Sequence, residues 1–378
     1  MLSFNGCCNA PDQLRFLPQC RSLAGPKALG RRGIVNISCC SSSLTFPQLR
    51  TSDDIVISER ANGSVGAILN LPTNESVSLM EHLRRGSIAE DGRSYKEKFI
   101  VRCSEVGPNK TSTMDAIANL MQEASCNHVQ RFSYSADGMG MTTNMKKLNL
   151  MWVTARNHIE VYKYPTWGNM VEVETWFEAT RAGLRRDFIV KDATGVLIGR
   201  GTSKWVSMNR TTRRVQKVPE EVLEELMGFT PQTPRLAFPE EDSSCLKKIP
   251  KLEEPAQYSR LGLKAKRTDL DMNGHVNNVT YIGWLLESVP QEIMDNYELE
   301  KITLDYRREC QSGDEVDSLA SIVMEDAEAI PELNRTNGFS IERKHKEDCY
   351  EFLHFLRFPD SGLEINRARS EWKRKSTK

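Results

Sequence analysis

The sequence lacks the features that mark membrane and metal-binding proteins. Its 378 residues contain no run of 18 apolar residues, so we expect no integral membrane segment. The ten cysteines include no CxxC pair and the six histidines show no HxxxH spacing, which argues against a structural zinc site or a disulfide framework. The 51 basic residues balance the 51 acidic ones, so the basic excess of a nucleic-acid-binding protein is missing. We therefore expect a soluble folded protein without a nucleic-acid partner, a metal ion or another cofactor.

The even charge balance hides a basic N-terminal segment. Residues 1–52 hold six basic residues and one acid, together with seven serines and five of the ten cysteines. The rest of the chain carries 45 basic and 50 acidic side chains, a net charge of −5. A basic, serine-rich and acid-poor segment without a continuous apolar stretch is typical of an organelle transit peptide and not of a secretory signal. We predict a plastid transit peptide over residues 1–52, with an unfolded cytosolic extension as the alternative.

The remaining chain contains a weak internal repeat. Residues 168–172 are echoed by residues 313–317 at a spacing of 145, and residues 195–205 by residues 362–372 at a spacing of 167. An apolar stripe at helical spacing, from Met114 to Ala124, also returns at a spacing of 164. The change of 22 in the spacing predicts an insertion in the second half, at about residues 326–348. We therefore expect one domain design used twice.

Each half is predicted to contain one apolar helix and several long strands. Alternating apolar and polar residues predict strands over residues 170–177, 188–190 and 196–208, and again over 302–306, 316–322, 350–358 and 363–372. The predicted class is α+β, with a strongly bent antiparallel sheet wrapped around one helix in each copy. The predicted division is a flexible leader (53–92), a first domain (93–228), a proline-rich linker (229–258) and a second domain (259–378).

The densest polar group of the sequence, residues 269–278, precedes the second helix. For Asn277 and Asn278, helix capping and a part in the chemistry are both open. Capping does not explain the three other candidates, which are Asp271, Asn273 and His275. Their counterparts at a spacing of 164 are Gly107, Asn109 and Thr111, which include no acid and no histidine. A purely structural requirement would recur in both halves, so the difference points to chemistry in the second half.

Glu309 and Cys310 also differ from the residues at the equivalent positions of the first half. Their counterparts at a spacing of 145 are Tyr164 and Pro165. Adjacent residues of a regular strand face opposite ways, so only one of the pair is expected to reach His275. Parity places Cys310 on the apolar face of its strand and Glu309 on the polar face, but a bulge at the strand end would reverse this.

Residues 271–284, followed by residues 306–310, resemble the plant plastid acyl-acyl carrier protein (acyl-ACP) thioesterases, and the resemblance extends from about Tyr95 to Trp372. It implies two tandem hot-dog domains. It also implies hydrolysis of the thioester that joins a fatty acyl chain to acyl carrier protein, which ends plastid fatty acid synthesis. The sequence is more similar to the A-type, which prefers oleoyl substrates, than to the B-type, whose apolar anchor is missing before Tyr95. The implied partner is acyl carrier protein in the plastid stroma, and a homodimer is left open.

Two mechanisms use the candidate residues. In the first, Cys310 attacks the thioester carbonyl, His275 takes the thiol proton and Asn273 orients the imidazole. In the second, Glu309 or Asp271 activates a water molecule while His275 and Asn273 position the substrate. Both place the oxyanion at backbone N–H groups of the helix expected to start near Asn277. The sequence leaves the choice open.

Three further expectations concern the substrate. The stripe in the first half is either ordinary core or the lining of an acyl groove, and its members are Met114, Ile117, Leu120 and Met121. Because acyl carrier protein is acidic, we expect a basic docking patch. The candidates are one cluster of Arg181, Arg185 and Arg186 and another of Arg210, Arg213, Arg214 and Lys217. The rival functions are an organellar hot-dog acyl-CoA thioesterase and a non-catalytic acyl-binding protein.

Overall fold

The computed structural model describes residues 86–131, 140–239, 247–323 and 349–375. The chain divides into two compact units, Met1–Leu71 and Pro72–Lys378, and every described residue belongs to the second. The predicted transit peptide, residues 53–85 of the predicted leader and the predicted insertion at residues 326–348 lie outside the described residues.

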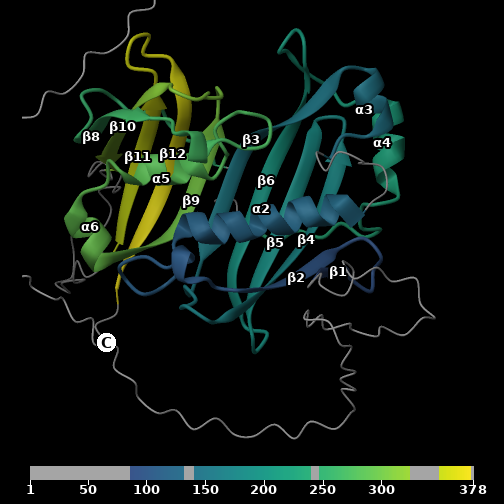
Figure 1. Cartoon of the computed structure of the whole chain (residues 1–378), viewed down its shortest axis with the longest axis horizontal. Helices are drawn as coiled ribbons and strands as arrows, with labels where there is room; N and C mark the ends of the chain where they lie inside the picture. Colours follow the sequence, from purple (N-terminus) through teal and green to yellow (C-terminus); the bar gives the residue numbers. More distant parts are fainter. Residues whose placement is uncertain (1–85, 132–139, 240–246, 324–348, 376–378) are drawn as a thin grey trace, which may run out of the picture. The chain divides into compact units, whose positions relative to one another are not determined.

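Alternating side chains build one antiparallel sheet of 12 strands through the described residues (Figure 1). The strands of the first half are β1 (Gly86–Ile88), β2 (Tyr95–Ile100), β3 (Leu150–Val161), β4 (Met170–Thr180), β5 (Gly183–Asp192), β6 (Leu197–Asn209) and β7 (Val215–Gln216). Those of the second half are β8 (Tyr258–Lys264), β9 (Tyr297–Tyr306), β10 (Glu315–Ile322), β11 (Cys349–Arg357) and β12 (Glu364–Arg374). The helices are α2 (Met114–Arg131), α3 (Thr143–Lys147), α4 (Glu220–Met227), α5 (Thr280–Leu286) and α6 (Gln291–Asn296), with 3-10 turns η1 (Cys103–Glu105) and η3 (Arg267–Asp269).

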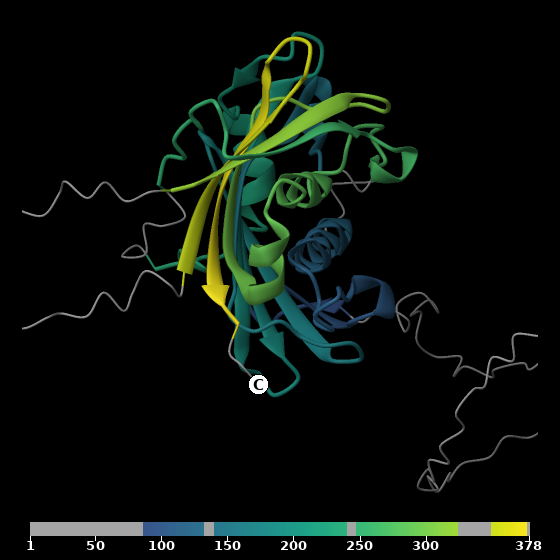
Figure 2. The same ribbon diagram turned by 90° about the vertical axis from the view of Figure 1, so that its left-hand side faces the viewer.

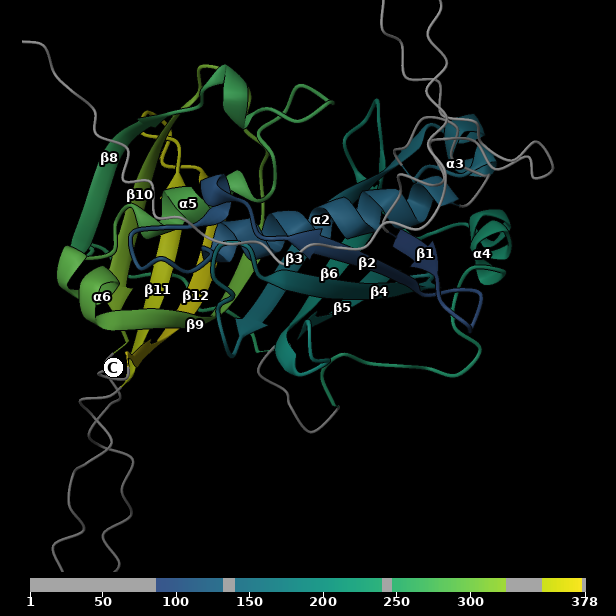
Figure 3. The same cartoon turned by 60° about the horizontal axis from the view of Figure 1, so that its bottom comes forward.

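The two halves have the same topology. The order β2-β4-β5-β6-β3 in the first half is repeated as β8-β10-β11-β12-β9 in the second, and the two sets join through β3 and β9. Helices α2 and α5 both lie against one face of the sheet (Figure 1, Figure 2, Figure 3). Their apolar stripes share one core cluster, in which Ile117 of α2 and Leu285 of α5 are fully buried. The prediction of one bent-sheet design used twice is confirmed.

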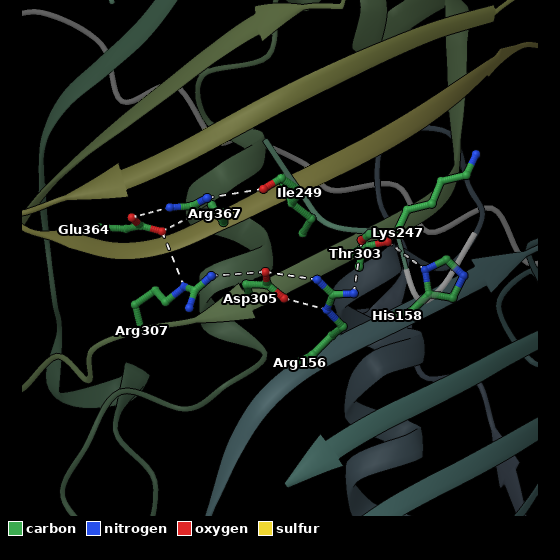
Figure 4. A network of polar contacts seen from close by, with 9 residues as sticks. All are labelled: Arg156, His158, Lys247, Ile249, Thr303, Asp305, Arg307, Glu364 and Arg367. Atoms are coloured by element: carbon green, nitrogen blue, oxygen red, sulfur yellow. Dashed lines mark hydrogen bonds and ion pairs between the residues drawn. The ribbon is translucent and has the colours of Figure 1, made fainter. Parts of the chain in front are cut away.

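The strands that join the halves meet at a pseudo-twofold position. His158 of β3 pairs with Thr303 of β9, and these residues are equivalent at the repeat spacing of 145. His158 Nδ1 lies 2.7 Å from Thr303 Oγ1 (Figure 4). Arg156 Nε contacts Asp305 Oδ1 at 2.6 Å on one side, and Lys301 Nζ approaches Glu160 at 3.7 Å on the other. A largely buried polar network therefore fixes the register between the halves.

The predicted linker is in large part packed against the sheet. Trp176 Nε1 donates a hydrogen bond to the carbonyl of Arg235 at 2.8 Å, and Phe238 is buried against the ring of His158. Arg156 also donates to the carbonyl of Lys247 (Figure 4). These side chains alternate with the residues that face the helices, so residues 235–238 and 247 cover the opposite face of the sheet.

Two other expectations change in detail. The predicted leader was expected to be flexible up to residue 92, but β1 begins at Gly86 and pairs with β2, with Gly86 opposite Glu97. The sheet therefore starts inside that segment. Residues 323–348 join β10 to β11, whereas only Arg181 and Ala182 join β4 to β5. The extra residues of the second half thus fall at this connection.

Candidate active site

The loop that precedes each long helix has the same backbone in both halves. A bridge between Leu270 and Val276 in the second half repeats the bridge between Val106 and Ser112 in the first, at the spacing of 164. The positive φ of Gly274 (76°) likewise repeats that of Lys110 (63°). The first half builds this backbone without an acid or a histidine at the equivalent positions, so the shape of the loop does not account for Asp271 and His275.

Asp271 organises the loop of the second half. Its Oδ1 accepts hydrogen bonds from the backbone N–H groups of Asn273 (2.8 Å) and His275 (3.2 Å). Its Oδ2 accepts a bond from the side-chain amide of Asn273 at 3.2 Å. The side chain of Asn273 is therefore engaged with Asp271, on the exposed side of the loop. Asp271 fixes the backbone from which the imidazole of His275 projects.

His275 and Glu309 lie side by side. Residue 275 forms a bridge with Gln311, which brings the segment after β9 next to the loop. Nε2 of His275 lies 3.6 Å from Oε1 of Glu309. The two side chains are 30% and 39% exposed, so both remain accessible to a substrate and to water.

A third charged group completes this pair. Nη2 of Arg213 lies 2.5 Å from the same Oε1 of Glu309. Arg213 belongs to the β6–β7 hairpin of the first half, so both halves contribute to the site. The sequence placed Arg213 in a basic cluster but gave no signal for its contact with Glu309, because the two residues are 96 positions apart.

Cys310 points away from this group. Its side chain is 0% exposed and belongs to the main core cluster. Its backbone N–H donates a hydrogen bond to the hydroxyl of Tyr281 at 2.9 Å. Burial raises the pKa of the Cys310 thiol to about 11, and the nearby Asp314 carboxylate acts in the same direction. A buried thiol with this pKa carries very little thiolate at neutral pH.

The start of α5 differs from the prediction. The helix begins at Thr280, and two N–H groups at its start are already bonded. The backbone N–H of Val279 donates to the side chain of Asn277 at 2.9 Å, and that of Thr280 donates to the carbonyl of Asn277 at 3.0 Å. The expectation that these groups are free for an oxyanion is therefore wrong for Val279 and Thr280. The N-cap position of α5 is Val279, so Asn277 lies two residues before it and accepts the N–H of Val279 without being the helix cap that the sequence suggested.

Contacts from the first half hold the loop against the sheet. The side-chain amide of Asn278 donates to the hydroxyl of Thr154 in β3 at 2.9 Å. The hydroxyl of Tyr306 donates to the carbonyl of Asn278 at 2.9 Å and accepts a bond from Asn157 at 3.2 Å. The site is therefore built at the junction of the halves.

The apolar stripe of α2 is fully packed. Its four members are between 1% and 5% exposed and lie in the main core cluster: Met114, Ile117, Leu120 and Met121. Met121 reaches β6, where a Cβ added to Gly201 would meet its sulfur at 2.9 Å. In this structure the stripe forms the core between α2 and the sheet.

The two basic clusters have different surroundings. Arg186 is 4% exposed and donates to Nδ1 of His128 at 3.0 Å, so its place in a docking surface is wrong. Arg185 pairs with Asp187, and Arg181 pairs with Glu220. The second cluster is exposed throughout, along the β6–β7 hairpin beside Glu309: Arg210, Arg213, Arg214 and Lys217. No helix among the described residues is long and apolar enough to span a membrane.

Residues 92–226 match the acyl-ACP thioesterase N-terminal domain, and residues 252–374 match the C-terminal domain of the same family. Among curated relatives, oleoyl-acyl carrier protein thioesterase 2 of Arabidopsis thaliana is 56% identical over 86% of this chain and 88% of its own length. The chain belongs to the acyl-ACP thioesterase family. The oleoyl-acyl carrier protein thioesterase of Coriandrum sativum is 58% identical over 80% of this chain and 83% of its own length.

Comparison with further members of the acyl-ACP thioesterase family shows which type the chain resembles more. The palmitoyl-acyl carrier protein thioesterase of Arabidopsis thaliana is 39% identical over 82% of this chain, well below the oleoyl relatives. The expected likeness to the A-type is thereby confirmed. The solved 12:0-ACP thioesterase of Umbellularia californica is 37% identical, covers 75% of this chain and 95% of its own length, and superimposes with a TM-score of 0.64. The predicted tandem hot-dog fold is confirmed.

Proposed function

We propose that this protein hydrolyses long-chain acyl-ACP thioesters, with oleoyl-ACP as the preferred substrate, and releases the free fatty acid in the plastid stroma. Family membership and the 56–58% identity to relatives named as chloroplastic oleoyl-acyl carrier protein thioesterases support the reaction and the compartment. The observation that carries the catalytic part is the contact between His275 and Glu309, which exists only in the second half. An acyl-binding protein without activity would have no use for it.

Glu309 is the proposed general base. Its carboxylate lies beside His275 and is 39% exposed, whereas Cys310 is buried and its thiol pKa is raised to about 11. The carboxylate of Asp271 is engaged by the backbone of its own loop, so it fits a positioning role. General acid-base catalysis by a positioned carboxylate contributes about 10²–10⁴-fold to a rate.

The proposed reaction needs only water. Glu309 removes a proton from a water molecule while the water oxygen forms a bond to the thioester carbonyl carbon. The tetrahedral intermediate then collapses and the carbon–sulfur bond breaks. The proton passes from Glu309 through His275 to the departing sulfur, which leaves as the thiol of acyl carrier protein. The acyl group leaves as the carboxylic acid, and no acyl-enzyme forms.

The β6–β7 hairpin is the proposed docking surface for acyl carrier protein. Arg210, Arg214 and Lys217 are exposed there, next to the hairpin residue that contacts Glu309. An acidic carrier bound to this hairpin would deliver its acyl thioester at the site. Charge reversal by Arg214→Glu and Lys217→Glu should raise the KM for acyl-ACP with little change in kcat, and the increase should shrink at high salt. An unchanged KM would exclude the β6–β7 hairpin as the docking surface.

The division of work follows the predicted domains. We propose that the first domain, residues 93–228, holds the acyl chain and that the second, residues 259–378, supplies the catalytic pair. The homodimer stays a prediction that sedimentation of the purified protein can test.

A substrate panel tests the proposed function directly. The protein lacking residues 1–52 is assayed on acyl-ACP and acyl-CoA thioesters of several chain lengths, saturated and unsaturated. We expect the highest kcat/KM for oleoyl-ACP. Equal rates on the CoA thioesters would instead favour the acyl-CoA thioesterase, and fatty-acid binding without hydrolysis would favour the binding protein.

A further inference from the structure

We propose that Arg213, contributed by the first half, is the positioning residue for Glu309 in the second half. The inference rests on the proposed thioester hydrolysis with Glu309 as its base. Nη2 of Arg213 and Nε2 of His275 both approach Oε1 of Glu309, at 2.5 Å and 3.6 Å. The same carboxylate oxygen thus faces one group from each half.

The hairpin around Arg213 is well braced. Within it, the backbone N–H of Asn209 donates to the carbonyl of Arg214 (3.0 Å), and that of Arg213 donates to the carbonyl of Asn209 (2.9 Å). The side chain of Asn209 accepts bonds from the N–H groups of the two intervening threonines. Asn149, directly before β3, accepts the N–H of Arg210 and donates to Thr211. The base of the Arg213 side chain is therefore fixed relative to the sheet.

The backbone of Arg213 is unfavourable for arginine. Its φ is 55°, in the left-handed region, which favours glycine and asparagine. A non-glycine residue in this region costs about 1 kcal/mol, and such strain gathers at functional sites. Asparagine would suit the turn better than arginine does. The contact of the guanidinium with Glu309 accounts for an arginine at this unfavourable backbone position.

The chemistry of arginine suits a positioning role and excludes proton transfer. The guanidinium stays protonated throughout the accessible pH range, so it cannot act as the acid or the base. It can hold one carboxylate oxygen as the fixed positive partner of an ion pair. Arg213 and Glu309 are 41% and 39% exposed, and ion pairs with that exposure contribute little to folding stability. Loss of the pair should therefore affect turnover much more than folding.

The test compares Arg213→Asn with Arg213→Lys in the full protein, on oleoyl-ACP. Asparagine keeps the left-handed turn and removes the charge. We expect kcat to fall about 10- to 100-fold, because a misplaced reacting group costs rates of this order, while KM and the melting temperature stay near wild-type values. Lysine should recover part of kcat, since an ammonium can make one contact with the carboxylate. In a Glu309→Gln background, Arg213→Asn should have almost no further effect on kcat.

Lys110→Asn is the matched control. Lys110 is an exposed basic residue with a φ of 63°, in the loop of the first half that is equivalent to the His275 loop. The ion pairs of Glu309 are with Arg213 and His275. This variant should keep wild-type kcat and KM. Unchanged kcat in Arg213→Asn, or a raised KM with unchanged kcat, would overturn the positioning role. An inactive wild-type protein would refute the proposed function itself, so the two failures are distinguishable.

Discussion

The kcat of the Cys310→Ala variant distinguishes a mechanism with Cys310 as the nucleophile from one with Glu309 as the general base. Cys310 is fully buried and its thiol pKa is raised to about 11 by burial. At pH 7 the thiolate fraction of such a thiol is roughly 10⁻⁴, because each pH unit below the pKa lowers it tenfold. The thioester would also have to enter the core to reach the sulfur. We therefore expect Cys310→Ala to keep most of the wild-type kcat.

Glu309→Gln should have the opposite effect. The substitution keeps the size of the side chain and removes its ability to take a proton, so kcat should fall about 10²–10⁴-fold, the usual contribution of a general base. Cys310→Ala should instead reduce stability by about 1 kcal/mol, through the small cavity left by the sulfur atom. Steady-state hydrolysis of oleoyl-ACP and thermal unfolding measure the two effects separately. Cys126→Ala, which removes a thiol from α2, is the control.

The pH dependence gives an independent reading of the same question. If the Cys310 thiolate were the nucleophile, kcat would rise about tenfold for each pH unit up to about 11, that is about 100-fold between pH 7 and 9. If Cys310 takes no part in the reaction, the ionisation of its thiol does not affect kcat, and this slope is absent after the uncatalysed hydrolysis of the thioester is subtracted. Loss of turnover in a folded Cys310→Ala variant, together with a hundredfold rise to pH 9, would refute the reasoning.

Three shorter predictions concern stability and specificity. Asp305→Ala should lower the free energy of unfolding by about 3–5 kcal/mol, because it removes the carboxylate that Arg156 contacts at the junction of the halves; denaturant titration measures this. Burial lowers the pKa of His354 to about 4, so as the pH falls below 6.5 the unfolded state takes up this proton before the folded state does. The free energy of unfolding should therefore drop by roughly 3 kcal/mol between pH 6.5 and 4. His354→Gln should remove this drop. Met121 is packed against β6 beside Gly201, so Met121→Phe should overpack the core between α2 and the sheet and lower the free energy of unfolding by about 1–3 kcal/mol. A folded variant with a shifted chain-length preference would instead indicate an acyl groove beside α2.

The sequence predicted the elements whose two faces differ in polarity. Strand β4 alternates clearly from residue 170 onward, and the helix stripe from Met114 onward keeps one apolar side, so both were recognised. Strand β3 was missed, although it joins the halves. Its buried apolar residues lie at its two ends, Leu150 at the start and Ile159 and Val161 at the finish. Its other face carries His158 and Glu160 in a buried polar network. Periodicity in hydrophobicity cannot detect a strand whose buried face is charged.

The site was predicted in part for a related reason. Comparison of the repeats singled out Asp271, His275 and Glu309, because side chains that differ between two similar backbones stand out in one sequence. The parity of β9 also separated Glu309 from Cys310 correctly, since Glu309 is exposed beside His275 and Cys310 is buried. Arg213 could not be assigned this way. Its contact depends on how a hairpin of one half approaches the other, and no local pattern encodes that approach.

The division of labour between the halves is therefore less complete than the repeat suggests. The second half carries the histidine and the carboxylate, but its loop is held by Thr154 and its proposed base by Arg213, both from the first half. Strands β3 and β9 also pair with each other, so neither half has a complete sheet alone. If the halves arose from one ancestral unit, the shared backbone of the two loops records that origin. The contacts across the junction then give the half without an acid or a histidine at the equivalent loop positions a part in building the proposed site.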